Sequence, residues 1–251
     1  MKSFIGWIGG KNRLKNIIIP MIPDDCDRYI EVCGGAGWVL FGKKPKSGQM
    51  EVFNDTDSNL INLYLQVKNN CDELCREIDK LHSRELFTMY RQNFAINKPL
   101  TDVERAAQYL YLIKCSFGST KHSFATATKR LYNTVDYLPK VYDRLKDVVI
   151  ENLDFEKLIK TYDRPTALFY VDPPYVGTEN YYEGHFTHDD HIRLNHVLSG
   201  IKGRFILSYN DCDFIRNLYR DFNIIEVSRL NALSGTVEKR GEFKELIIRN
   251  F

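Results

Sequence analysis

Asp172, Pro173, Pro174 and Tyr175 form a tetrapeptide whose residue types could hold and orient a small planar amine. They follow the apolar run 167–171, which is typical of a buried strand, so the Asp172 carboxylate is expected at the end of a sheet. The two prolines fix the backbone and lack N–H donors, but their carbonyl groups can accept hydrogen bonds. Two acceptors beside an aromatic ring suit the methylation of an exocyclic amine, although an ordinary tight turn is the alternative interpretation.

The exocyclic amine of a nucleic-acid base is a poor nucleophile, because its lone pair is delocalised into the ring. Two acceptors that bind its N–H bonds can orient it and favour tetrahedral character as a methyl group arrives. A base reaches such a pocket only after it leaves the duplex, and flipped bases are held by stacking and by hydrogen bonds to their edges. A sulfonium methyl donor is already activated, so proximity and alignment can supply much of the rate and no metal is expected.

A glycine-rich segment with Gly34 and Gly35 directly follows the first predicted strand. Glycines at this place let the backbone approach a ligand closely, and their spacing differs from that of the dinucleotide-binding fingerprint. Asp55 ends the next strand about 20 residues further along, where a carboxylate can accept hydrogen bonds from ribose hydroxyls. Asp57 is a second candidate for that role, and either residue could instead cap the helix that follows.

The segment 7–11 places Trp7 beside two glycines and Lys11. The indole could line one face of a ligand, and the ammonium group could bind a carboxylate. A loop that simply packs on the domain is the alternative interpretation.

Short β-branched and aromatic runs alternate with helical patterns over most of the chain. The alternation predicts an α/β fold with a mostly parallel sheet covered on both faces, and such sheets bind ligands beyond the carboxyl ends of their strands. The predicted strands are 29–33, 51–53, 148–150, 167–171, 205–209, 223–227 and 245–248, and the predicted helices between them are 59–69, 189–198 and 213–219.

The interval 70–146 does not fit this alternation. Helical patterns cover 71–81 and 102–113, and a stretch rich in Ser, Thr and Gly follows at 115–128. Residues 114–130 include several basic side chains and no acidic ones, which favours contact with a polyanion, although a solvated loop is the alternative. We therefore expect a helical insert that carries a long functional loop.

The composition is that of an ordinary globular protein, with 251 residues, 43% hydrophobic and 27% charged. No apolar stretch approaches the length of a membrane span, and the first residues lack the apolar core of a signal peptide, so a cytoplasmic location is expected. A net charge of +2 does not by itself indicate nucleic-acid binding, because an acidic domain can mask a basic face. The six cysteines include no Cys-x2-Cys pair, so a structural zinc site is not expected.

Histidines and aspartates between 185 and 196 raise the alternative of a metal site. The spacing of His188, His191 and His196 does not bring all three onto one helical face, so no metal site is predicted. The aspartates at 189 and 190 are interpreted as the start of a helix. Residues 181–185, with His185, are interpreted as a loop beside the site that closes over the target base.

Taken in order along the chain, these segments resemble the Dam-like, D12 class family of adenine-N6 DNA methyltransferases in its α-type arrangement. The resemblance implies a Rossmann-like S-adenosylmethionine-dependent methyltransferase fold with a helical target-recognition insert. It divides the chain into a catalytic domain, 1–69 and 147–251, and a DNA-binding domain, 70–146. The similar segments span nearly the whole chain and are 7–11, 31–37, 55–61, 172–175, 208–211 and 245–251.

The resemblance also implies roles for individual residues. Asp172, Pro173, Pro174 and Tyr175 would form the catalytic tetrapeptide. Asp172 and the Pro173 carbonyl would bind the target N6, and Tyr175 would stack on the flipped base. Asp55 would hold the cofactor ribose, and Asp154 and Phe155 its adenine. S-adenosylmethionine, with S-adenosylhomocysteine as its product, would contact Trp7, Lys11, Glu31, Gly34, Gly35, Asp55, Asp154, Phe155 and Asp172. Double-stranded DNA would contact Ser119, Lys121, His122, Lys129 and Arg130.

Two segments depart from the family pattern. Cys33 stands where an aromatic or small residue is common, so the cofactor pocket is expected to differ in shape. The segment 114–121 does not clearly match the recognition loop of the GATC enzymes, so GATC stays one option and no recognition sequence is predicted.

Three other functions stay open at this point: methylation of cytosine N4 in DNA, methylation of adenine in RNA, and a catalytically silent DNA-binding role. The main prediction is a monomer that acts on duplex DNA in a bacterial cell or a phage-infected host, without a metal or a membrane. The sequence leaves a dimer open as well.

Overall fold

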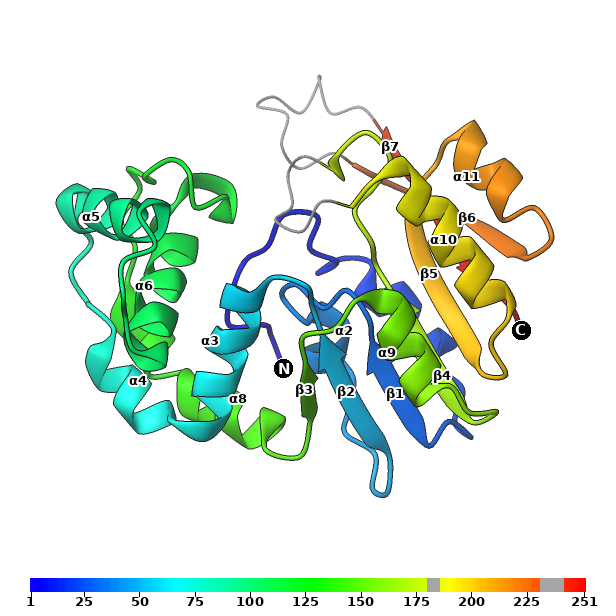
Figure 1. The fold of residues 1–251 in the computed structure, drawn as a ribbon, viewed down its shortest axis with the longest axis horizontal. Coiled ribbons are helices and arrows are strands. Elements are labelled where there is room, and N and C mark those ends of the chain that lie inside the picture. The colour runs from blue at the N-terminus through cyan, green and yellow to red at the C-terminus, as the bar shows by residue number, and fades with distance from the viewer. Residues whose placement is uncertain (180–185, 231–241) are drawn as a thin grey trace.

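The computed structural model describes residues 1–179, 186–230 and 242–251. Within them, seven strands form one sheet in the order β3-β2-β1-β4-β5-β7-β6 (Figure 1). β1 to β5 run parallel, and β7 lies antiparallel between β5 and β6. The strands are β1 (Arg28–Glu31), β2 (Met50–Asn54), β3 (Val149–Glu151), β4 (Ala167–Val171), β5 (Arg204–Asn210), β6 (Asn223–Leu230) and β7 (Glu242–Arg249). The predicted α/β fold with a mostly parallel sheet is therefore confirmed.

Both faces of the sheet are covered, because successive side chains of a strand point to opposite faces. Tyr29 and Phe53 pack into the core with the N-terminal segment and the insert helices. Ile30 and Phe169 pack into the second core with the later helices. The first layer holds α1 (Lys15–Ile18), α2 (Trp38–Gly42) and α3 (Ser58–Asn69), and the second holds α9 (Phe155–Tyr162), α10 (His188–Ser199) and α11 (Asp213–Leu218).

The insert between α3 and β3 is helical, as predicted, and stands beside the sheet (Figure 1). The prediction of a helix over 71–81 was too long, since the helix ends at Glu77 and Ile78 already has extended backbone angles. The insert shares the first core through Leu110 and Leu138, and it has a smaller core of its own around Phe87. Its elements are α4 (Cys71–Glu77), α5 (Arg84–Ala95), α6 (Asp102–Cys115), η2 (Phe117–Ser119), α7 (Leu131–Val135) and α8 (Leu138–Leu145).

The strand order places a ligand site at one edge of the sheet. Chain order runs outward from β1 through β2 and β3 on one side, and from β4 through β5 on the other. The carboxyl ends of β1 and β4 therefore flank the point where the direction of winding changes, which is where open α/β sheets bind their ligands.

Candidate active site

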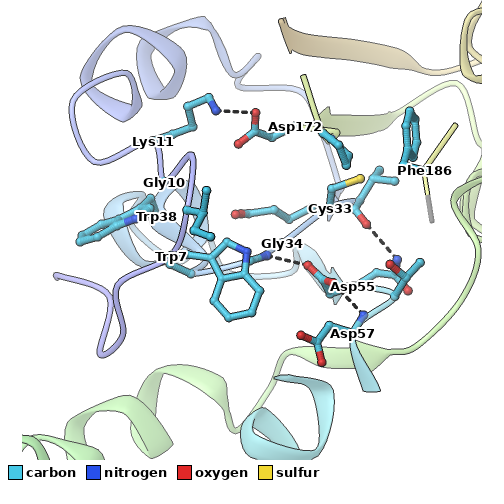
Figure 2. A pocket seen from close by; sticks show the side chains of 18 of the residues that line it. Trp7, Gly10, Lys11, Cys33, Gly34, Trp38, Asp55, Asp57, Asp172 and Phe186 are labelled. Atoms are coloured by element: carbon cyan, nitrogen blue, oxygen red, sulfur yellow. Dashed lines mark hydrogen bonds and ion pairs between the residues drawn. The ribbon is translucent and has the colours of Figure 1, made fainter. Parts of the chain in front are cut away.

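The carboxyl ends of β1, β2 and β4 open into a cavity of about 280 Å³. The loop after each strand contributes a lining residue, namely Gly34, Asp55 and Asp172, and the N-terminal segment adds Trp7 and Lys11 (Figure 2). Segments that are far apart in sequence thus meet at one site, as the sequence pattern predicted.

Asp172 is held by two side chains that contact the same carboxylate oxygen. Lys11 Nζ lies 2.7 Å from Asp172 Oδ1, and Ser208 Oγ donates to the same atom at 2.8 Å. Burial raises the pKa of Asp172 above its ordinary value, while the Lys11 ammonium and the Ser208 hydroxyl act in the opposite direction. The two contacts fix the orientation of the carboxylate, and among the described residues none donates a side-chain hydrogen bond to Oδ2.

The rest of the tetrapeptide divides between the cavity and the core. Pro174 lines the cavity, whereas Pro173 is buried. Tyr175 is only 7% exposed, its hydroxyl donates to Glu245 Oε1 at 2.7 Å, and Lys11 Nζ lies 4.4 Å from its ring centre. In this structure the Tyr175 ring is buried beside Lys11, and its stacking on a base stays a prediction.

Gly34 and Gly35 leave room that a side chain would fill. A Cβ on Gly34 would lie 2.2 Å from the buried Phe53 ring, and one on Gly35 would lie 2.6 Å from Trp7. Gly35 also has a φ of +49°, a conformation that residues with a side chain rarely adopt. The backbone here can therefore come close to both Trp7 and a ligand, which fits the binding of a cofactor.

Asp55 and Asp57, the two candidates for the ribose contact, have separate structural roles. Asp55 accepts hydrogen bonds from the backbone N–H groups of Gly35 at 2.8 Å and of Asp57 at 2.9 Å, and it lines the cavity. Burial raises the pKa of Asp55 to about 6. Asp57 caps α3, because its Oδ1 accepts from the N–H groups of Asn59 and Leu60. Both carboxylates line the cavity, but the contacts of Asp57 with the start of α3 make Asp55 the better candidate for the ribose contact, which stays a prediction.

Glu31 is a buried carboxylate at the base of the cavity. Its Oε2 accepts hydrogen bonds from the Tyr29 hydroxyl and the Leu40 N–H, both at 2.8 Å. Burial raises the pKa of Glu31 to about 8, above its ordinary value of 4.5. With this pKa, Glu31 is mostly protonated at pH 7, and a cationic ligand in the cavity would favour its charged form.

Because the pKa of Glu31 is raised in the folded protein, we expect its ionisation to lower the free energy of unfolding as pH increases. Because the folded state holds this proton more tightly than the unfolded state, the stabilisation is lost as pH rises from about 4.5 to about 8. Glu31→Gln keeps an acceptor for Tyr29 and removes the ionisation. We expect the unfolding free energy of this variant, relative to the native chain, to increase between pH 6 and pH 9 in urea titrations. The exposed Glu85→Gln is the control, and an equal increase there would contradict the assignment to Glu31.

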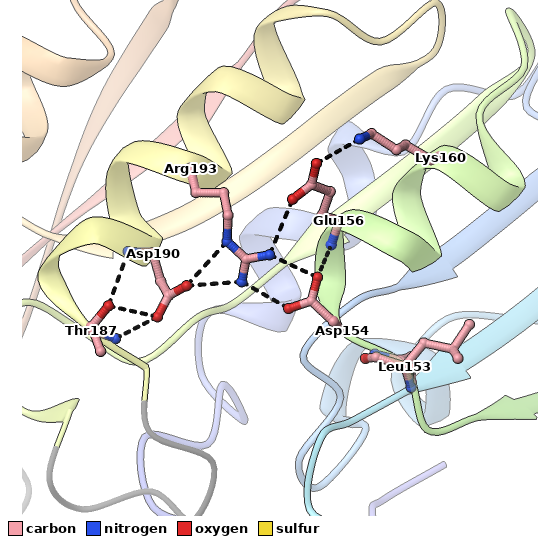
Figure 3. A network of polar contacts seen from close by, with 8 residues as sticks. Leu153, Asp154, Glu156, Lys160, Thr187, Asp190 and Arg193 are labelled. Carbon is pink, nitrogen blue, oxygen red and sulfur yellow. Dashed lines mark hydrogen bonds and ion pairs between the residues drawn. The ribbon is translucent and has the colours of Figure 1, made fainter.

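Asp154 and Phe155 are predicted to hold the cofactor adenine, and both contact Arg193 of α10. Figure 3 shows the Arg193 guanidinium between Asp154, Asp190 and Glu156. The Arg193 guanidinium donates to both carboxylate oxygens of Asp154, at 2.9 and 2.8 Å, and lies 4.0 Å from the Phe155 ring centre. It also bonds Asp190 and Glu156. Phe155 is 5% exposed, so an adenine ring that stacks on it has to share this space with Arg193.

The residues predicted to bind DNA lie on two sides of their loop. His122 and Arg130 are exposed and Lys129 is half-buried, which leaves them available to a duplex. Ser119 and Lys121 instead face the protein and line the cavity, as does His122 in part. Lys121 Nζ is 2.7 Å from the Tyr109 hydroxyl and 3.6 Å from Asp57 Oδ2, so its charge is compensated within the protein.

Sequence reasoning missed several residues at or near the site. Arg193 was not singled out, although Asp190 three residues earlier on the same helix is a recognisable pairing signal. Phe117 is 71% exposed next to the cavity-lining loop, and a lone aromatic in a polar stretch could have indicated it. Ser208 and Glu245 begin the family-like segments 208–211 and 245–251, but no role was predicted for either residue. Cys33 lines the cavity, as its position in the glycine-rich segment suggested.

Neither a metal centre nor a membrane span is found in the described part of the chain. No three His, Cys, Asp or Glu residues among residues 1–179, 186–230 and 242–251 are grouped as metal ligands. His191 is buried and bonds the Tyr209 hydroxyl and Glu179, while His185 and the predicted closing loop 181–185 lie outside the described residues. Over the same ranges, no helix is both long and apolar enough to span a bilayer.

An α/β sheet with a glycine-lined cavity at its switch point, and with residues 172–175 beside that cavity, fits a methyltransferase that acts on nucleic-acid amines. Comparison with known proteins narrows this class. Residues 7–233 match the family model of the D12 class N6 adenine-specific DNA methyltransferases, and the chain belongs to that family. It is therefore an adenine-specific DNA methyltransferase with the Rossmann-like fold of these enzymes, and this family favours adenine in DNA over the cytosine and RNA alternatives.

Similar proteins span the full chain. A type II methyltransferase of Lactococcus lactis subsp. cremoris is 30% identical, with 100% of this chain and 96% of that protein covered. A type II methyltransferase of Methanocaldococcus jannaschii is also 30% identical, over 100% and 99%. A DNA adenine methylase of Haemophilus influenzae is 26% identical over 98% of this chain and 92% of that one.

Proposed function

We propose that the cavity binds S-adenosylmethionine, which supplies an activated methyl group, and that the enzyme transfers this group to N6 of an adenine flipped out of duplex DNA. The observation that carries the proposal is that Asp172 lies in the same cavity as Gly35, Asp55 and Trp7. The Asp172 carboxylate thus lies in the same cavity as the groups that suit a nucleoside and an amino-acid tail. The product, S-adenosylhomocysteine, would leave by the same cavity.

Each lining residue fits a part of the proposed cofactor. Asp55 suits the ribose hydroxyls, and Asp154 and Phe155 suit the adenine edge and face. Buried Glu31 suits the cationic amino-acid end, and the close approach of Gly34 and Gly35 leaves space for the ligand.

The mechanism follows from how Asp172 is held. Lys11 and Ser208 both occupy Oδ1, so Oδ2 is the oxygen that accepts an N–H bond of the target amine. The Pro173 carbonyl is proposed as the second acceptor, and together they orient the nitrogen lone pair toward the methyl group. The ionised carboxylate also stabilises the positive charge that develops on N6 and receives the proton that N6 releases.

The DNA-facing surface is proposed to consist of the exposed side of loop 116–124 and the residues that follow it. Phe117 offers an exposed ring that can stack on a base or fill the space of a displaced one, and His122, Lys129 and Arg130 lie within thirteen positions of it in sequence. We propose a monomer as the active form, acting on double-stranded DNA inside a bacterial cell or a phage-infected host.

Transfer of a labelled methyl group from S-adenosylmethionine to unmethylated genomic DNA tests the proposal. Nucleoside analysis should give N6-methyladenine, and mapping should place it in one short sequence context. Label in single-stranded DNA alone, or adenine methylation without a sequence context, would contradict site-specific action on a duplex.

Lys129→Ala combined with Arg130→Ala should weaken DNA binding and make it less dependent on salt. Each phosphate contact that is lost lowers the slope of log K against log salt by about 1. Titrations at several salt concentrations measure this slope. The control pair is Lys44→Ala with Lys202→Ala, two exposed lysines that precede β2 and β5 and so lie at the opposite edge of the sheet. An unchanged slope in the first pair would remove this stretch from the DNA-facing surface.

A further inference from the structure

The loop 116–124 of the insert reaches the cofactor cavity through the Lys121 side chain. Lys121 Nζ contacts three separate parts of the chain: the Tyr109 hydroxyl of α6 at 2.7 Å, Asp57 Oδ2 at the start of α3 at 3.6 Å, and the Trp7 ring, whose centre is 4.9 Å away. The Lys121 side chain is 16% exposed. A loop that was expected to face DNA alone therefore also contacts the catalytic domain.

Asp57 joins these contacts to the framework of the protein. Its Oδ1 caps α3, while its Oδ2 accepts a hydrogen bond from the Tyr109 hydroxyl at 2.5 Å and pairs with Lys121. The Asp57 side chain is only 4% exposed, so solvent only weakly screens its ion pair with the Lys121 ammonium group. Lys121 is thus held at a fixed point beside Trp7, which lines the cavity.

The backbone of the loop requires such an anchor. Ser119 and Lys121 have φ values of 60° and 66°, a left-handed conformation that is unfavourable for a residue with a side chain. Ser119 also packs against the N-terminal segment, since a Cβ on Gly6 would lie 2.3 Å from Ser119 Oγ. The contacts of Lys121 and Ser119 with the catalytic domain therefore compensate for an unfavourable loop conformation.

The two sides of this loop face the two proposed ligands. Residues 119–122 form part of the cavity wall, and Phe117 is exposed on the same loop. A ligand that packs against Trp7 and this wall would also stabilise the anchored conformation of the loop that is proposed to meet DNA.

We propose that Lys121 is a positioning residue that couples cofactor binding to DNA binding, through its contacts with Asp57, Tyr109 and Trp7. The inference rests on the proposed function, because it requires the cofactor in this cavity and DNA on this loop. Binding of either ligand increases the affinity for the other, and by linkage the factor is the same in both directions.

The test measures the Kd of S-adenosylhomocysteine by calorimetry, with and without a saturating unmethylated duplex that carries the mapped methylation site. For the native chain we expect DNA to tighten binding by about fivefold or more, and S-adenosylhomocysteine to tighten DNA binding by the same factor. Lys121→Met should bring this factor close to 1, whereas Lys121→Arg, which keeps the charge, should restore most of it. Tyr109→Phe, a milder change, should reduce the factor partly.

Lys129→Ala is the matched control, because it should weaken DNA binding but keep the coupling factor. A native factor of 1, or an unchanged factor in Lys121→Met and Tyr109→Phe, would overturn the coupling role while methyl transfer continues. If the native chain bound no S-adenosylhomocysteine and methylated no DNA, the proposed function itself would fail and the coupling role with it.

Discussion

Asp172→Asn is expected to lower the rate of methyl transfer by roughly 10³-fold or more while cofactor binding stays nearly unchanged. The amide oxygen can still accept from Lys11 and Ser208, so the local packing is retained. The second position, however, becomes an NH2 group that donates toward the amine of the base instead of accepting from it. The charge that stabilises the developing cation on N6 is lost as well.

Single-turnover transfer to DNA and calorimetric binding of S-adenosylhomocysteine separate the two effects. Asp172→Ala should lose at least as much activity, and it also leaves the Lys11 ammonium buried without its carboxylate. Ser208→Ala is the control for disturbance of the pocket and should cost far less. Loss of cofactor binding in a folded Asp172→Asn protein would place Asp172 in cofactor binding rather than in the methyl-transfer step.

The sheet was predictable because its signals are local. The runs 167–171 and 205–209 are apolar, end in turn residues and appear as strands within one residue of the prediction. The strand-end residues Gly34, Asp55 and Asp172 were predictable as a site for the same reason, since parallel strands bring their carboxyl ends to one edge.

Contacts between elements were not predictable, because they depend on packing rather than on spacing. Lys121 has the positive charge expected of a DNA contact. Its side chain points into the protein because it contacts Asp57 and Tyr109, which lie far from it in sequence. Arg193 meets Phe155 only because α9 and α10 pack on the same face of the sheet. The early end of α4 at Glu77 likewise accompanies contacts between elements, because Ile78 packs into the first core and Asp79 accepts a hydrogen bond from Tyr90 of α5.

Lys11→Met should change the pH dependence of activity and of stability in opposite directions. Lys11 is 5% exposed, and its ammonium group holds down the pKa of Asp172, which burial raises. Without it, the pKa of Asp172 increases further, so a larger fraction of this carboxyl is protonated at a given pH and the ionised acceptor for the amine is lost in that fraction. We expect methyl transfer at pH 7 to fall by about 10²-fold or more and to recover in part as pH rises.

Stability should follow the reverse course, because a carboxyl whose folded pKa is raised loses its stabilising contribution as pH increases through that pKa. The unfolding free energy of Lys11→Met, relative to the native chain, should therefore decrease with pH over the interval in which its activity recovers. Ser208→Ala, which removes a neutral donor from the same Asp172 oxygen, should shift both profiles in the same directions but less. Parallel pH profiles of single-turnover transfer and of urea unfolding test this. Activity that stays low at every pH, with no pH-dependent loss of stability, would show that Lys11 acts on the ligand and not through the charge of Asp172.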